Sequence, residues 1–134
     1  MTSSPAELDG GTCRLELAAD VSLLATARLF SAAVARRAGC DETVVEDVKL
    51  AVSEACTAGA EGAGPGRDLT IETQERDGSL VFVVTTPAHP GARSSDPDMP
   101  SHLDLISGLF PGALEEPSAG AWSLTFRVPV DQVA

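Results

Sequence analysis

Aromatic residues are scarce in this sequence of 134 residues, which contains four Phe, one Trp and no Tyr. A core built around many packed rings is therefore excluded, and Leu, Val, Ile and Ala are expected to fill it. The apolar content of 43% is ordinary for a globular protein, and the length suits one domain with a single core. We expect a flexible tail over residues 1–11 and a single domain over residues 12–134.

Positive charge is also in short supply. Nine Lys and Arg stand against 20 Asp and Glu, which gives a formal net charge of −11. Nucleic acid and anionic membrane surfaces would repel such a chain, so neither is an expected partner. The charge suits either a partner with a basic surface or simply a highly soluble protein.

Long apolar runs and paired cysteines are missing too. No apolar run approaches the roughly 18 residues of a membrane-spanning helix, and the N-terminus lacks the basic and apolar segments of a secretion signal. The three cysteines, Cys13, Cys40 and Cys56, include no CxxC pair, so no metal site or redox pair is expected. We predict a reduced, cytoplasmic protein.

What the sequence does contain is a succession of strand and helix patterns. Alternating or continuous apolar residues predict strands, at 12–19, 67–75, 79–86, around 113–115 and at 121–130. Apolar residues at helical spacing predict helices, at 20–39, 40–64 and 102–110. Asp77-Gly78 predicts a hairpin turn, and residues 87–101 form a long loop. This order predicts an α+β fold, a two-layer α/β sandwich with a mixed, mostly antiparallel sheet and helices on one face.

Local signals place the ends of the first two helices. Asp20 or Ser22 is expected to cap the first helix and Asp41 the second, because their oxygens accept from free N–H groups. Gly39 is expected to stop the first helix. In the second helix, Ser53 is expected to face solvent.

The second helix ends in the stretch "AVSEACTAGAEGAG", residues 51–64, in which side chains become sparse after a well-patterned start. Glycines at positions 59 and 62 are poor helix formers, so we expect this end to fray or unwind.

The phrases "LLATARLF", "VEDVKLAVSEAC" and "LTFRVPV" resemble the bacterial anti-sigma factors that double as serine-protein kinases. These share the histidine-kinase-like ATPase fold of gyrase B, MutL and a class of heat-shock chaperones. The resemblance covers roughly residues 12–130, and "LAVSEAC" is its most specific part.

The resemblance implies a nucleotide site whose second-helix residues are only half retained here. In the family a Glu acts as a base, and an Asn four residues later, on the same helix face, holds the Mg²⁺ that bridges the ATP phosphates. Glu54 occupies the Glu position, but Ala58 occupies the Asn position and Gly62 that of a frequent His. A methyl group cannot ligate a metal.

Two further family motifs are altered. The "DxGxG" motif that reads adenine is matched by "PAHPG", which places Pro87 at the Asp, His89 at the first Gly and Gly91 at the second. Proline has no acceptor carboxylate. The glycine-rich lid is matched by "DMPSHLDLI", which has no Gly and includes His102. The resemblance with these losses predicts a pseudokinase that binds neither ATP nor Mg²⁺ as a cofactor.

Several candidate residues have a plainer interpretation beside the functional one. Glu54 is either a residual base or a half-exposed carboxylate with structural hydrogen bonds, and the second is expected. His89 and His102 are expected to be solvated rather than ligands of a metal. Cys56 is expected to be packed rather than reactive. Arg28 on the first helix is implied by the resemblance as a partner-binding residue, with an exposed structural Arg as the alternative.

Three function hypotheses follow. The first is a homodimeric anti-sigma regulator that sequesters a sigma factor and is released by an anti-anti-sigma antagonist or another signal, without kinase activity. The second is a divergent ATP-dependent serine-protein kinase that acts on such an antagonist. The third is a sensor that binds another small ligand in the vacated pocket.

Overall fold

The computed structural model describes residues 11–63, 68–87, 101–118 and 120–130. Five strands form one sheet in the order β1-β2-β3-β5-β4, and three helices follow a 3-10 turn, η1, in the chain. The elements are β1 (Thr12–Ala18), η1 (Val21–Leu23), α2 (Leu24–Arg37), α3 (Glu42–Ala63), β2 (Asp68–Arg76), β3 (Ser79–Thr86), α4 (His102–Leu109), β4 (Leu114–Ser118) and β5 (Ala121–Pro129).

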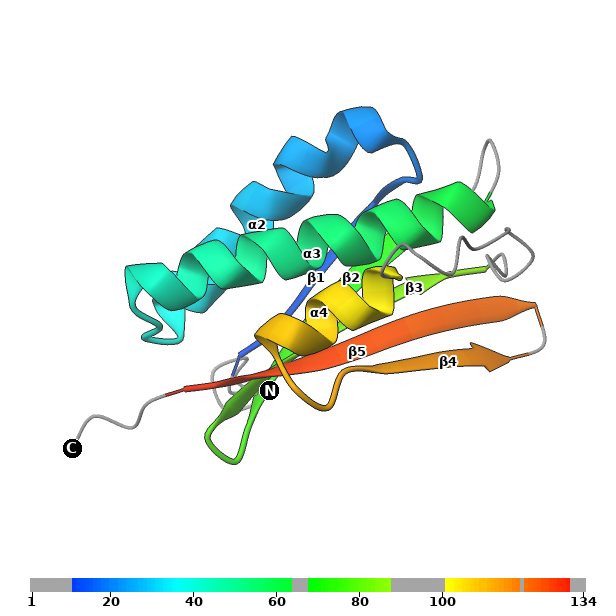
Figure 1. Ribbon diagram of the computed structural model, residues 1–134. Coiled ribbons are helices and arrows are strands. Elements are labelled where there is room, and N and C mark those ends of the chain that lie inside the picture. The colour runs from blue at the N-terminus through cyan, green and yellow to red at the C-terminus, as the bar shows by residue number, and fades with distance from the viewer. Residues whose placement is uncertain (1–10, 64–67, 88–100, 119, 131–134) are drawn as a thin grey trace, which may run out of the picture.

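The three helices lie on one face of the sheet (Figure 1), which confirms the predicted two-layer α+β sandwich. The sheet was expected to be mixed, but all four strand pairs are antiparallel. The predicted hairpin at residues 77 and 78 joins β2 to β3. Its register pairs Arg76 with Ser79, and Asp77 and Gly78 both have positive φ, at 51° and 79°, as a two-residue hairpin turn requires.

The core lies between the helices and the sheet. Alternate strand residues face it, and the largest fully buried side chains are Trp122, Phe82, Phe126, Leu69, Ile71, Leu80, Ile106, Leu124, Val45, Val48, Val52 and Val84. Aliphatic residues are most numerous in the core, as expected. Four of the five aromatic residues are also buried there, namely Phe82, Phe110, Phe126 and Trp122, and Phe30 is partly buried. Phe126 stacks on Phe82 at 5.0 Å and on Phe110 at 5.3 Å between centroids.

The helix ends follow the capping signals with one exception. Gly39, with φ of 97°, follows α2, and Asp41 accepts a hydrogen bond from the Val44 N–H at 3.0 Å, so both predictions are confirmed. Asp20 instead caps the 3-10 turn by accepting from the Ser22 N–H at 2.9 Å, and α2 begins without a side-chain cap. The prediction for the start of this helix was therefore wrong by one turn.

The second half of α3 does not unwind at Gly59, contrary to expectation, because α3 runs on to Ala63. Gly59 is buried, and a Cβ there would lie 2.7 Å from Leu69 Cδ2 and 3.1 Å from Trp122 Cζ3. The glycine lets the helix approach the sheet closely, and this packing holds the turn despite the poor helix propensity of glycine.

Candidate functional site

The candidate site lies where the second half of α3 faces the start of α4. Helix α4 begins at His102 because Ser101 and Asp104 form a capping box: the Ser101 Oγ accepts from the Asp104 N–H at 3.0 Å, and the Asp104 carboxylate accepts from the Ser101 N–H at 3.2 Å. This box fixes the first turn of α4 and with it the position of the His102 ring.

His102 joins the two helices. Its Nδ1 lies 2.7 Å from Glu54 Oε1, and its Nε2 lies 3.2 Å from Glu61 Oε1. The side chains of His102 and Glu54 are 23% and 25% exposed, so the first contact is half-buried. A neutral imidazole donates from one nitrogen only, whereas an imidazolium donates to both carboxylates.

The outcome for these residues is mixed. Glu54 is a half-buried helix carboxylate in a structural hydrogen bond, as its plainer interpretation held. His102 begins α4, as the predicted helix over residues 102–110 requires. It is not solvated as was expected, because its ring contacts two carboxylates. Sequence reasoning missed Glu61, although it lies seven residues after Glu54, about two helix turns, and so on the same face.

Ala58 completes the helix face on which the family places its metal ligand. Its side chain is 1% exposed and belongs to the core. Two consecutive small residues, Ala58 and Gly59, thus fill the position where α3 meets β2 and β5. Where the family would have an Asn oxygen, the described structure has packed hydrocarbon.

Pro87 directly follows β3 and is exposed. Thr86, the last residue of β3, is buried, and its Oγ1 has no hydrogen-bond partner within the described part of the chain. His89 and Gly91 lie outside the described residues, as does the rest of the stretch 88–100, and the burial of Gly62 is not described.

Arg28 lies away from these residues, on α2. Its Nη1 donates to the Ser53 Oγ at 3.2 Å in a half-buried contact, so Ser53 is not the outward-facing residue that was expected. Next to it Leu29 is 73% exposed. A hollow of about 320 Å³ is lined by Ala25, Arg28, Leu29, Ala32, Arg36 and Lys49.

The cysteines add no reactive group to the site. Cys56 is buried in the core, and burial raises the pKa of its thiol to about 12, which confirms that it is packed rather than reactive. No group of three or more His, Cys, Asp and Glu suited to a metal occurs among the described residues. None of the described helices is long and apolar enough to cross a membrane.

Comparisons with known proteins agree with this architecture. Residues 17–117 match the family of the histidine kinase-like ATPase domain. A search of curated proteins found no matching relative. Among solved structures, the RsbU and RsbW domains of Rv1364c from Mycobacterium tuberculosis superpose with a TM-score of 0.74 at 17% identity.

That superposition covers 92% of this chain but only 34% of the solved chain, so this chain spans about a third of that protein's length. At this identity the likeness concerns the fold. The family match extends over more than half of the chain and includes α2, α3, β2, β3 and α4. The chain therefore belongs to the histidine kinase-like ATPase domain family.

Proposed function

We propose that this protein is a regulator of the anti-sigma class that sequesters a sigma factor by protein–protein binding and transfers no phosphate. The surroundings of Glu54 and Ala58 on α3 support the loss of kinase activity. The Glu54 carboxylate is bound to His102 of α4, and the residue one turn further along α3 is the buried Ala58.

Both features oppose phosphoryl transfer. A catalytic base must turn a lone pair toward the acceptor hydroxyl, and the Mg²⁺ that neutralises the phosphates needs oxygen ligands. Glu54 Oε1 already accepts from an imidazole, and Ala58 offers no oxygen. Pro87 adds a third loss, because it brings no carboxylate to the end of β3 where the family reads adenine.

The proposed docking surface is the outer face of α2. Arg28 and the exposed Leu29 border a hollow of about 320 Å³, and arginine is among the residues that are enriched in binding hot spots. The net charge of −11 would speed the encounter with a basic sigma region. A homodimer, and release by an anti-anti-sigma antagonist, belong to the same proposal.

A divergent serine-protein kinase is the second candidate, and the retention of Glu54 at the family's base position favours it. Calorimetric titration with Mg-ATP and transfer of labelled phosphate to a co-purified protein decide between the two. We expect neither micromolar binding nor transfer, and either result would establish the kinase instead.

The partner is tested by affinity purification from the native cell, with Arg28→Ala and Leu29→Ala compared with Arg37→Ala. Arg37 is an exposed arginine on the same helix and outside the hollow. We expect the unmodified protein and Arg37→Ala to retain a sigma factor, and the other two variants to lose most of it. Recovery of metabolic enzymes alone would refute the proposal.

A further inference from the structure

A cleft of about 700 Å³ is lined by residues at the start of α3, the end of α4 and the end of β5. Figure 1 shows these element ends at the end of the domain opposite the candidate site. The lining of the cleft is Gly39, Cys40, Asp41, Val44, Asp47, Ser79, Leu109, Phe110, Pro111, Arg127 and Pro129. Asp47 and Ala58 are 11 residues apart on one helix, about 16 Å along its axis. The cleft is therefore separate from the positions of the nucleotide motifs.

The floor of the cleft is apolar and fixed. Phe110 is only 5% exposed and stacks on Phe126 at 5.3 Å, and Val44 and Leu109 pack against the same core. Ligand sites in proteins are commonly preformed hollows of this size with apolar walls and a few polar groups.

One side of the cleft is an open strand edge. Strand β4 begins at Leu114, which pairs with Thr125, so β5 continues through Phe126–Pro129 with β3 as its only strand partner in the described chain. The backbone from Phe126 to Val128 thus presents an unpaired edge, and such an edge accepts an added strand.

The charges of the cleft favour a strand with a basic side chain near the helices, because two carboxylates on the helix side stand against one guanidinium, that of Arg127 on β5. Asp41 and Asp47 line the cleft on the helix side; Asp41 caps α3 through one oxygen, and Asp47 makes no hydrogen bond or ion pair with any residue that the structure describes. With a net charge of −11 over the whole chain, a cationic group is favoured near these carboxylates.

We propose that this cleft binds an extended peptide segment that carries an apolar and a basic residue two positions apart and adds as a short strand to the open edge of β5. Residues i and i+2 of a strand share one face, so both side chains can point to the helix side of the sheet. An apolar side chain of the segment packs on Phe110, and a basic side chain pairs with Asp47. The inference is independent of the proposed function, because it requires neither a sigma factor nor the loss of kinase activity.

The test uses calorimetric titration of the full chain with a capped hexapeptide, Thr-Leu-Thr-Lys-Thr-Leu, in which Leu and Lys share one face of the strand. One comparison peptide carries N-methyl groups on the edge-facing amides, which removes the donors that strand addition needs, and another carries Glu in place of Lys. We expect saturable binding of the first peptide and at least tenfold weaker binding of the other two. Equal binding of the N-methylated peptide would overturn strand addition.

Two protein variants distinguish an effect of the cleft on peptide binding from an effect of the overall charge. Asp47→Lys and Asp68→Lys change the net charge equally, but Asp68 is an exposed residue at the start of β2 and lies outside the cleft lining. We expect Asp47→Lys to weaken the Leu-Lys peptide at least tenfold and Asp68→Lys less than twofold. Equal effects of the two variants, or no saturable binding at millimolar peptide, would refute the site.

Discussion

At the scale of single residues, Gly59 sets how closely α3 approaches the sheet. It is a glycine inside a 22-residue helix, and its missing side chain makes room for Leu69 and Trp122. The Trp122 indole N–H is in turn satisfied by the Glu115 carboxylate at 2.6 Å. The stretch 51–64, which resembles a nucleotide-binding helix without its metal ligand, thus also packs α3 against the sheet.

Substitution Gly59→Ala should therefore destabilise the protein. The alanine gains up to about 1 kcal/mol of helix propensity, but its Cβ would overlap Leu69 at 2.7 Å, and such overpacking costs about 1–3 kcal/mol. After the full propensity gain is subtracted, we expect a net loss of up to about 2 kcal/mol in the free energy of unfolding, measured by urea denaturation.

Gly108 provides the matched control, because it also lies in a helix but a Cβ there would meet nothing within 4 Å. Gly108→Ala should leave stability unchanged or raise it by up to about 1 kcal/mol. If Gly59→Ala were as stable as Gly108→Ala, the close approach of α3 to the sheet would not depend on the glycine.

At the scale of elements, His102 ties α4 to α3. Replacing it with Ala removes both carboxylate contacts of the ring, whereas Gln retains one hydrogen-bonding group. A half-exposed contact of this kind contributes about 0.5–1.5 kcal/mol, so we expect faster amide hydrogen exchange in α4 for the Ala variant and an intermediate rate for Gln. Exchange in α2 serves as the internal reference and should not change. Equal rates in α4 for the unmodified protein and both variants would contradict the role of His102 in holding α4 against α3.

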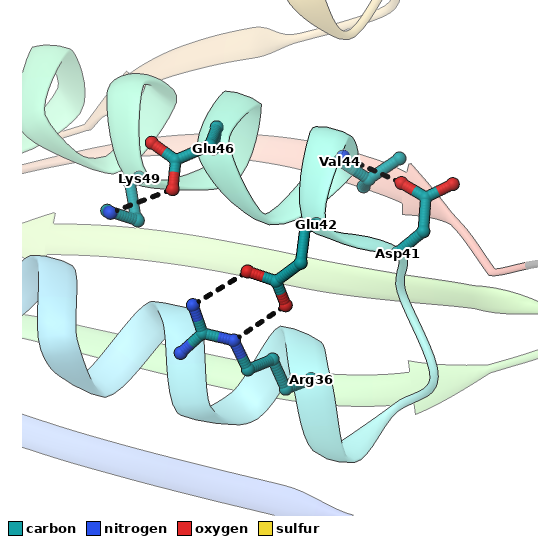
Figure 2. A network of polar contacts seen from close by, with 6 residues as sticks. All are labelled: Arg36, Asp41, Glu42, Val44, Glu46 and Lys49. Atoms are coloured by element: carbon teal, nitrogen blue, oxygen red, sulfur yellow. Dashed lines mark hydrogen bonds and ion pairs between the residues drawn. The ribbon is translucent and has the colours of Figure 1, made fainter.

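The Arg36–Glu42 contact joins the end of α2 to the start of α3 (Figure 2), with Nε and Nη2 donating to the two carboxylate oxygens at 2.8 and 2.9 Å. The hydrogen bond from Arg36 lowers the pKa of Glu42. A carboxyl group whose pKa is lower in the folded state stabilises the protein above its unfolded pKa, and this contribution is lost as pH falls through the folded value.

The melting temperature of Glu42→Gln should therefore lie slightly below that of the unmodified protein at pH 7, and the difference should shrink as pH falls below about 4.3, the ordinary pKa of Glu. Both residues are exposed, so the difference is expected to be small. Thermal melts of both proteins from pH 7 to pH 3 measure it. A difference that does not vary with pH would show that the charge of Glu42, and so its ion pair with Arg36, is not its source.

The elements could be predicted from the sequence because their signals are local. Alternation in β5, the Asp77-Gly78 turn and the Asp41 cap each depend on neighbours a few residues away. The site depends on distant pairs: His102 and Glu54 are 48 residues apart, and the room that Gly59 makes is defined by side chains on β2 and β5. Sequence spacing named Glu54 and His102 separately but could not bring them together.

At the scale of the whole molecule, the excess of 11 negative charges opposes the compact state through self-repulsion. In the described ion pairs, such as Arg14–Glu72 and Arg36–Glu42, both side chains are exposed. These pairs contribute little stabilisation, so salt that screens them removes little. Screening should therefore relieve more repulsion than it removes attraction.

We accordingly expect the melting temperature at pH 7 to rise by a few degrees between about 10 and 200 mM NaCl, since the Debye length falls from roughly 30 Å to below 10 Å over this range. An uncharged osmolyte of equal osmolality is the control and should not reproduce the rise at these concentrations. A fall in melting temperature with salt would show that attractive pairs outweigh the net charge, and would also weaken the expectation that cationic peptides are drawn to this surface.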